Sequence, residues 1–142
     1  MFVKMRINFI IAAVVILVVG CDTYSRTYKA DCSVPPSSFI TTKDGIGHLG
    51  YLVVVNMSPN GIVRWAGATL TDAEFEVNLK VANGLLPKPT VVFDPDANAP
   101  CERVERVREI MVNSLFCRGE IMNCGEGHDP RNWPMADRNS LY

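Results

Sequence analysis

The feature that most constrains the fold is a β-hairpin signal in the middle of the chain. Residues 49–57 are β-branched and apolar at both alternating sets of positions, which predicts a strand buried on much of both faces. Asn60 and Gly61 follow, and both residue types tolerate the positive φ angles of a tight turn. Residues 62–66 then supply the return strand. We therefore predict a hairpin over residues 50–66.

A helix is predicted directly after the hairpin. Thr71 and Glu74 have the spacing of a capping box, in which each side chain accepts a hydrogen bond from the other residue's main-chain amide. Apolar residues recur behind it at helical spacing, and Gly84 is a plausible stop. This pattern predicts a helix over residues 72–82.

The second half of the predicted domain repeats the order of strand and helix. Residues 90–93 read as a short strand, and Pro100 suits the first turn of a helix over residues 100–116. A last short strand is predicted at 121–122, and an edge strand at 39–42. The expected fold is α+β and two-layered, with two helices packed on a small mixed β-sheet, built as a β-hairpin followed by two βα units.

The N-terminus has the layout of a secretory leader. Lys4 and Arg6 precede an unbroken apolar run over residues 9–19, which is about half the length needed to cross a roughly 30 Å hydrocarbon core. The run ends in Val-Val-Gly-Cys, which resembles a bacterial lipobox with Cys21 as the acylated residue. Residues 1–20 are therefore predicted to be a lipoprotein signal peptide. The alternative is an apolar N-terminal anchor with an incidental Cys21.

Lipidation would decide the location of the whole chain. Acyl chains such as palmitate on Cys21 would tether the domain to a membrane outside the cytoplasm, because two or more chains anchor stably. Asp22 resembles a signal for retention in the inner membrane, so we expect the periplasmic face of that membrane. Polar residues with two prolines make 21–38 a flexible tether. The tail over 125–142 lacks periodicity and is predicted to be mobile, apart from docking of Trp133.

The remaining four cysteines are an even number in an exported chain, which suggests disulfides. Cys117 and Cys124 are close in sequence, and we favour their pairing. Cys32 and Cys101 would then tie the N-terminal arm to the domain. Free or buried thiols stay open as the alternative.

Size and charge limit the classes of partner. Cleavage before Cys21 leaves about 120 residues, which is one domain, and removes two of the 14 basic residues, for a net charge of about −3. No basic patch stands out, so a nucleic-acid partner is not expected.

The pieces between residues 49 and 122 resemble the periplasmic domain of the ExbD/TolR family. The matching segments are 52–55 before the Gly61 turn, 62–67 after it, 70–71 opening a helix, 90–94, 100–107 and the helix exit at Gly119. The resemblance implies a two-layer domain in an inner-membrane complex that couples proton flow to envelope transport, with paired periplasmic domains. This chain departs from the family because residues 7–20 hold no acidic residue to handle a proton.

Two sets of residues are candidates for chemistry. The first places a hydrolase or metal site on Asp94, Asp96, His48 and His128, and the second places a metal on Glu126, His128 and Asp129. Solvated loops and a strand-ending turn explain both sets equally well. Nucleophile-elbow and phosphate-loop motifs are absent from the sequence, so we expect no enzyme, metal or cofactor. Arg64 and Trp65 can face a ligand, but packing explains Trp65 as well.

The expected function is therefore a non-enzymatic, membrane-anchored periplasmic interaction domain. The resemblance makes it an accessory of an ExbD/TolR-like envelope transport or energy-coupling complex, with an inner-membrane protein complex as its partner and with possible homodimers. The alternative is an unrelated small envelope lipoprotein with an assembly or stress role.

Overall fold

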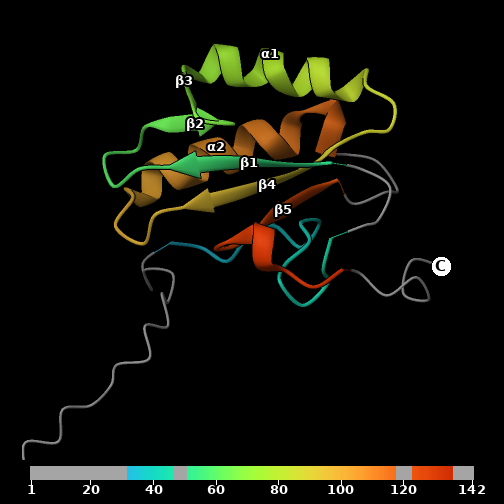
Figure 1. The fold of residues 1–142 in the computed structure, drawn as a ribbon. Coiled ribbons are helices and arrows are strands. Elements are labelled where there is room, and N and C mark those ends of the chain that lie inside the picture. Colours follow the sequence, from blue (N-terminus) through green and yellow to red (C-terminus); the bar gives the residue numbers. More distant parts are fainter. Residues whose placement is uncertain (1–31, 47–50, 118–122, 136–142) are drawn as a thin grey trace, which may run out of the picture.

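A computed structural model of the 142-residue chain describes residues 32–46, 51–117 and 123–135. A single mixed sheet with the order β3-β2-β1-β4-β5 organises them (Figure 1). Its strands are β1 (Leu52–Met57), β2 (Val63–Trp65), β3 (Ala68–Leu70), β4 (Thr90–Pro95) and β5 (Cys124–Glu126). The helices are α1 (Asp72–Asn83), α2 (Cys101–Asn113) and the short 3₁₀ turns η1 (Leu115–Cys117) and η2 (Pro130–Asn132).

The topology explains why the fold has two layers. Strands β1, β4 and β5 are parallel, and α1 and α2 supply the two crossovers between them, while β2 and β3 run antiparallel on the other side of β1. Parallel crossovers are right-handed, so two that advance in the same direction place both helices on one face. The predicted α+β class, with two helices on a small mixed sheet, is confirmed.

The main core lies between the sheet and the two helices. Every second residue of each central strand points into it, such as Val55 and Met57 of β1 and Phe93 of β4. Phe75 and Leu79 of α1 meet them from above and are fully buried. This part of the interior is therefore filled by apolar packing.

The other face of the sheet is covered by the two ends of the described chain. Ile40 and Ile46 from the N-terminal arm pack with Val92 of β4 and with Trp133 from the C-terminal segment. The arm also extends the sheet edge, because Ile40 donates to the Cys124 carbonyl and accepts from the Glu126 amide. A small second core thus joins segments that are far apart in sequence.

The predicted hairpin is confirmed, with strands that lie within the predicted range, and a third strand follows it. Strand β2 ends at Trp65, and a turn at Ala66 and Gly67, with φ of 47° and 92°, starts a third strand β3 that was not predicted. Left-handed backbone is uncommon at a non-glycine residue such as Ala66, and the turn was therefore not predicted from the sequence.

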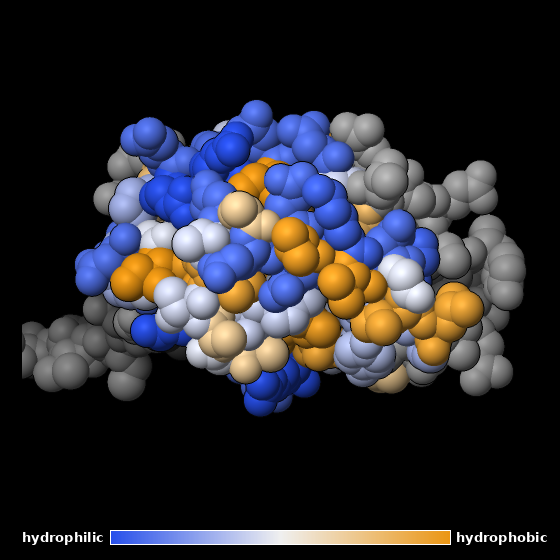
Figure 2. All heavy atoms as spheres, turned by 90° about the horizontal axis from the view of Figure 1, so that it is seen from above, coloured by the Kyte–Doolittle hydropathy of each residue, from blue (hydrophilic) through white to orange (hydrophobic). Residues whose placement is uncertain are grey.

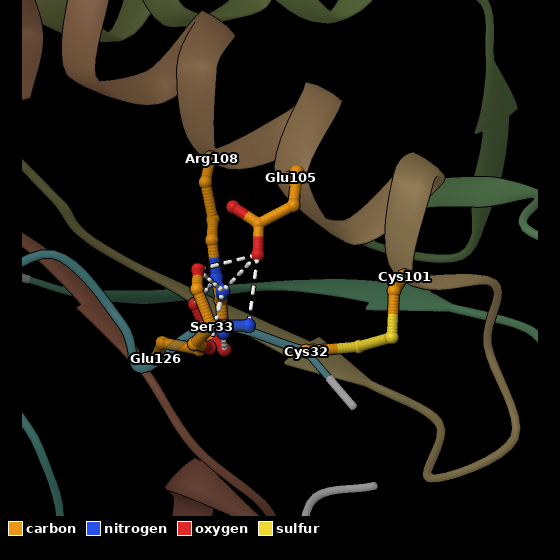
Figure 3. The surroundings of a disulfide bond; sticks show 6 residues. All are labelled: Cys32, Ser33, Cys101, Glu105, Arg108 and Glu126. Carbon is orange, nitrogen blue, oxygen red and sulfur yellow. Dashed lines mark hydrogen bonds and ion pairs between the residues drawn. A yellow bond between two sulfur atoms is a disulfide. The ribbon is translucent and has the colours of Figure 1, made fainter. Parts of the chain in front are cut away.

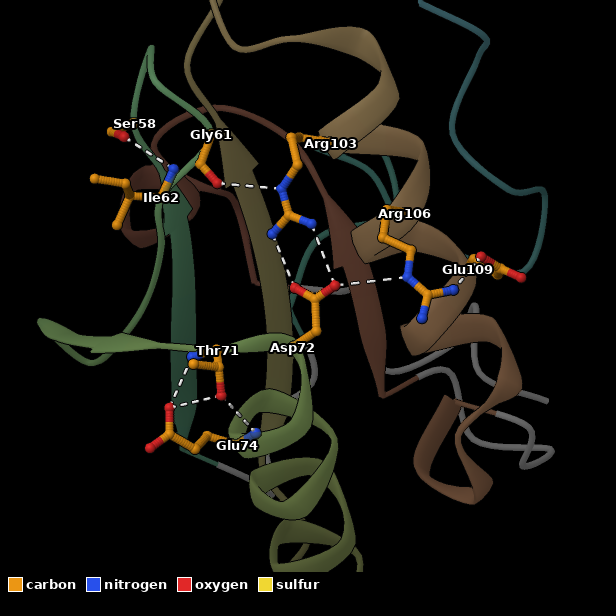
Figure 4. Close-up of polar contacts among 9 residues, drawn as sticks. All are labelled: Ser58, Gly61, Ile62, Thr71, Asp72, Glu74, Arg103, Arg106 and Glu109. Carbon is orange, nitrogen blue, oxygen red and sulfur yellow. Dashed lines mark hydrogen bonds and ion pairs between the residues drawn. The ribbon is translucent and has the colours of Figure 1, made fainter.

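Both predicted helices are present. The capping box is confirmed, because Thr71 accepts from the Glu74 amide and the Glu74 carboxylate accepts from the Thr71 amide at 2.7 Å (Figure 4). Helix α2 begins one residue later than predicted, with Pro100 as its N-cap. It ends at Asn113, where the extended backbone of Ser114 breaks the predicted run to 116.

The predicted boundaries of the folded part were too narrow at both ends. The arm is fixed from Cys32 onward, although 21–38 was predicted as a tether, and the predicted edge strand at 39–42 is a single bridge at Ile40. The tail was predicted to be mobile from 125, but β5, η2 and the docked Trp133 order it to 135, because the second core needs this cover. The predicted strand at 121–122 lies outside the described residues.

Candidate functional site

Three polar side chains meet at the carboxyl ends of the parallel strands. His128 Nδ1 lies 3.1 Å from Asp94 Oδ1, and the Asn56 amide donates to the other Asp94 oxygen at 3.3 Å. Asp94 and His128 belong to the predicted hydrolase site, whereas Asn56 was not named from the sequence. The Asp94 side chain is 13% exposed and the His128 side chain 48% exposed, so the group lies at the surface.

The other residues of the predicted hydrolase and metal sites do not join this group. Asp96 caps its own turn by accepting from the Asn98 amide at 2.8 Å, and His48 lies outside the described residues. Asp129 accepts from the Asn132 side chain, while Glu126 points to the opposite side of the sheet, into the helix layer. Among the described residues, no cluster of three His, Cys, Asp or Glu side chains is arranged to hold a metal ion.

Arg64 and Trp65 point to opposite faces of β2, as neighbours on a strand must. Trp65 packs edge-on against Phe75 with ring centroids 6.0 Å apart, so the packing interpretation of Trp65 is the one observed. Arg64 is exposed on the face away from the helices.

A buried ion pair joins α2 to β5. The guanidinium of Arg108 binds the carboxylate of Glu126 through two bonds of 2.6 and 2.7 Å (Figure 3). Burial raises the pKa of Glu126, and the hydrogen bonds from Arg108 oppose that rise. Either charge would be costly to bury alone, so each of these two side chains depends on the other for its place in the core.

The same guanidinium fastens the N-terminal arm. Arg108 Nη1 donates to the Ser33 carbonyl at 2.7 Å and to Glu105 at 2.9 Å, and the Ser33 hydroxyl also donates to Glu105 (Figure 3). These contacts lower the pKa of Glu105, with the Ser33 hydrogen bond as the largest cause. The arm is thus docked by a polar network next to a covalent bond.

That covalent bond is one of two disulfides, and both are the pairings favoured from the sequence. Cys32 bonds to Cys101 at the first residue of α2, with Cα atoms 5.1 Å apart. Cys117 bonds to Cys124 across the approach to β5, with Cα atoms 5.4 Å apart. The predicted lipidation site Cys21 lies outside the described residues. Within the described ranges, no helix has the length and apolarity to cross a bilayer.

Ion pairs also hold α1 against α2 at one end. Asp72 receives Arg103 through two bonds of 2.8 and 3.2 Å and Arg106 at 3.5 Å (Figure 4). The Arg103 hydrogen bonds are the largest cause of the lowered pKa of Asp72. Arg103 Nε donates to the Gly61 carbonyl as well, which ties the hairpin turn to the helices.

The apolar residues of the helix layer with the largest exposed fractions lie along α1 and just after its end. Val77 and Val81 are 54% and 60% exposed, and Leu85 and Leu86 continue the line past the helix end at 38% and 92%. We call these four residues the α1 strip. Figure 2, which looks onto α1, shows apolar spheres gathered in a band across this face. Singly scattered apolar residues are normal on a surface, whereas a continuous group marks an interaction site.

A groove of about 410 Å³ lies beside the α1 strip, between the C-terminal halves of the helices. Leu79, Ile110 and Phe116 are apolar residues of its lining. Its charged rim is already paired, since Lys80 binds Glu76 at 3.0 Å and Arg106 binds Glu109 at 2.6 Å. The groove therefore offers a mostly neutral surface.

The α1 strip is the exposed apolar surface that the sequence reasoning missed. Its signal was available, because Val77 and Val81 are four positions apart on a predicted helix whose buried side is formed by Phe75 and Leu79. Leu85 follows four positions later, past the helix end. The core of this small domain already covers the side of α1 that carries Phe75 and Leu79, so the apolar residues on its other side stay exposed.

Comparison with models of protein families, with curated proteins and with solved structures finds no match to this chain.

Proposed function

We propose that this chain is a non-enzymatic interaction domain, held by a lipid on Cys21 at the periplasmic face of a bacterial inner membrane. Its role in this proposal is that of an accessory subunit in an ExbD/TolR-like envelope transport or energy-coupling complex. The observation that carries it is the α1 strip, a line of four exposed apolar residues on the outer side of the helix layer.

Two further observations support an exported, partner-binding domain. Two disulfides in so small a domain suit an oxidising compartment, since cytosolic thiols are kept reduced. Apart from the additional strand β3, the element order of hairpin, helix, strand, helix and strand also agrees with the order on which the resemblance rests. A catalytic alternative would rest on Asn56, Asp94 and His128, and among the described residues no group of three His, Cys, Asp or Glu side chains is arranged there to hold a metal ion.

The anchor is tested by intact mass and membrane partitioning in a bacterial host, with the parent beside Cys21→Ala. The proposal expects the parent to lose residues 1–20, gain acyl mass and stay with membranes, and expects the variant to do neither. A parent that keeps its first twenty residues and carries no acyl mass would refute the lipid anchor.

The interaction surface is tested separately in the host's membranes. Val81→Asp places a charge in the α1 strip, and Val34→Asp places the same charge at another exposed valine, 84% exposed, as the matched control. Native gels of detergent-solubilised membranes should show the parent and the control in a complex larger than the monomer, and Val81→Asp as the free monomer. Equal migration of all three proteins would contradict the proposal. The alternative, an unrelated envelope lipoprotein, is favoured if that complex lacks a proton-channel subunit.

A further inference from the structure

Half of β1 has a neighbouring strand on one side only. Strand β1 pairs with β4 along all six of its residues, but it pairs with β2 only from Val55 to Met57. The last main-chain bond on the β2 side runs from the Ala66 amide to the Val54 carbonyl at 3.3 Å. The chain then turns away at Ala66 and Gly67 into β3. Beyond this point, no described strand lies beside Leu52 on the β2 side.

The main-chain groups of Leu52 point toward this open side. The carbonyls of Tyr51 and Met57 accept from Thr90 and Asp96, so the odd-numbered residues of β1 direct their main-chain groups toward β4. The Val54 carbonyl, in contrast, faces β2. Because these directions alternate along a strand, the N–H and carbonyl of Leu52 face the open side. An unpaired strand edge is a ready template for another strand.

A hollow of about 160 Å³ lies next to this edge, on the helix side of the sheet. Its lining is mainly apolar and comes from the start of β1, the end of β2, the second half of α1 and the segment that follows it: Tyr51, Val53, Trp65, Asn78, Val81, Ala82, Leu85 and Pro89. A cavity of about 150 Å³ holds one benzene ring, so this hollow has room for one apolar side chain.

Edge and hollow are in register with each other. Directly opposite residues of an antiparallel pair point to the same face of the sheet, as Val55 and Trp65 do here. A residue placed opposite Val53 would therefore point into the hollow that Val53 lines. A strand that continued the course of β2 would thus satisfy the main chain of Leu52 and fill the hollow together.

We propose that the open edge of residues 52–54, with the hollow beside it, binds an extended segment of a partner polypeptide by antiparallel strand addition. One apolar side chain of that segment, opposite Val53, occupies the hollow. The inference rests on the proposed function, because Val81 and Leu85 belong to both the hollow and the α1 strip. It goes further by naming the form of the partner.

The chemistry of the open edge favours a peptide strand as its binding partner. Main-chain N–H and carbonyl groups need directional partners, which a peptide strand supplies and a lipid tail does not. Residues 52–54 are Leu, Val and Val. They include neither a charged residue nor a proline, the residue types that commonly protect a strand edge from pairing with another strand. The turn at Ala66 ends the open edge on one side, and the described part of the edge is short, which favours a short extended segment over a folded domain.

The test is amide hydrogen exchange of the full chain in mild detergent, read by mass spectrometry. The probe is a blocked seven-residue peptide that alternates threonine with isoleucine and has phenylalanine at its centre. The expected result is slower exchange, by about tenfold or more, in fragments that contain residues 52–54. A copy of the peptide that is N-methylated on its pairing edge should give no protection.

Two variants separate strand pairing from simple apolar contact. Leu52→Pro removes the N–H that faces the open side and leaves the β4 ladder its donors, whereas Leu52→Ala removes the side chain and keeps the N–H. Leu52→Pro should bind the probe at least tenfold more weakly than Leu52→Ala, with far-UV circular dichroism showing that both are folded. Should Leu52→Pro not fold, the N-methylated peptide decides the question alone.

Several outcomes would overturn the inference. Equal protection by the methylated peptide, or protection confined to the α1–α2 groove, would refute strand addition. Protection of residues 52–54 that grows with the protein's own concentration, without any probe, would assign the edge to a second copy instead. A failure of strand addition leaves the proposed function standing if Val81→Asp still dissociates the membrane complex and Cys21 still carries lipid.

Discussion

Arg108 of α2 and Glu126 of β5 form a two-bond ion pair inside the helix layer, with side chains only 3% and 0% exposed. The pair is 18 residues apart in sequence and joins the last strand of the sheet to the helix that precedes it. The same arginine reaches Ser33, so one guanidinium connects the arm, the second helix and the last strand.

Removing one partner of this pair should be far worse than removing both. Arg108→Met leaves Glu126 buried alone and should cost about 3–5 kcal/mol of unfolding free energy, whereas adding Glu126→Leu should recover much of it. The measurement is urea denaturation at pH 7. Arg106→Met, at a half-exposed arginine, is the control and should cost much less than Arg108→Met.

The single variant should also respond to pH in a set direction. Burial raises the pKa of Glu126, and loss of Arg108 removes the main opposing cause. A folded state with a raised carboxyl pKa binds the proton more tightly, so the stability of Arg108→Met relative to the double variant should be greatest at low pH and fall as the pH rises through that pKa. A flat profile between pH 4 and 8 relative to the double variant would contradict this.

The two disulfides should contribute unequally. In the chain-entropy description, stabilisation grows with the closed loop, which gives about 4 kcal/mol for a loop of Cys32 to Cys101 and about 2.5 kcal/mol for one of Cys117 to Cys124. Their sequence separations are 69 and 7 residues. Paired serine substitutions at each bridge, compared by thermal unfolding without reductant, check the order. A larger loss from the shorter loop would contradict it.

Asp72 should give the protein part of its resistance to acid. Its pKa is lowered from the ordinary value of 3.8, chiefly by the hydrogen bonds from Arg103. A carboxyl with a lowered folded pKa stabilises the fold above its unfolded pKa, and this contribution is lost as the pH falls below 3.8. Asp72→Asn should therefore cost about 0.5–1 kcal/mol at pH 7, since the pair is partly exposed, and progressively less as the pH falls below 3.8. Parallel pH–stability curves would refute the assignment.

Two glycines should respond to alanine in opposite ways. A Cβ at Gly125 would lie 2.6 Å from the Ile40 side chain and 2.8 Å from its carbonyl oxygen, so Gly125→Ala should destabilise by about 1–3 kcal/mol. Gly84 has a helical φ of −86° and open surroundings, so Gly84→Ala should stabilise by about 0.4–1 kcal/mol. Chemical denaturation of both variants decides, and a neutral Gly125→Ala would show that the arm does not pack on β5.

The local parts of this fold could be predicted from the sequence, because short-range chemistry specifies them. The capping box of Thr71 and Glu74 and the tight turn at Gly61 each depend on residues within four positions. Strand β5 was missed because Gly125 and Glu126 carry no strand signal. Glu126 can be buried there only because Arg108 meets it, and that contact is long-range.

In the candidate site, too, some of the residues could be named from the sequence but their long-range contacts could not. Asp94 and His128 were named from the sequence and do meet, but they lie 34 positions apart, and only the parallel pairing of β4 with β5 shows that they are neighbours. The open edge at Leu52 could not be predicted, because it depends on where the partner strand stops and not on any property of the edge itself.

The bond between Cys32 and Cys101 has a mechanical consequence. A pull applied to the chain before Cys32 passes through covalent bonds directly into the first residue of α2. The arm from Ser33 to Ile46 then carries no load, so the second core need not resist being peeled away. Cys32 lies eleven positions after Cys21, and at about 3.3–3.6 Å for each step the two residues can be at most about 40 Å apart. An anchor at Cys21 would therefore hold the domain close to the bilayer and let it bear tension without unfolding.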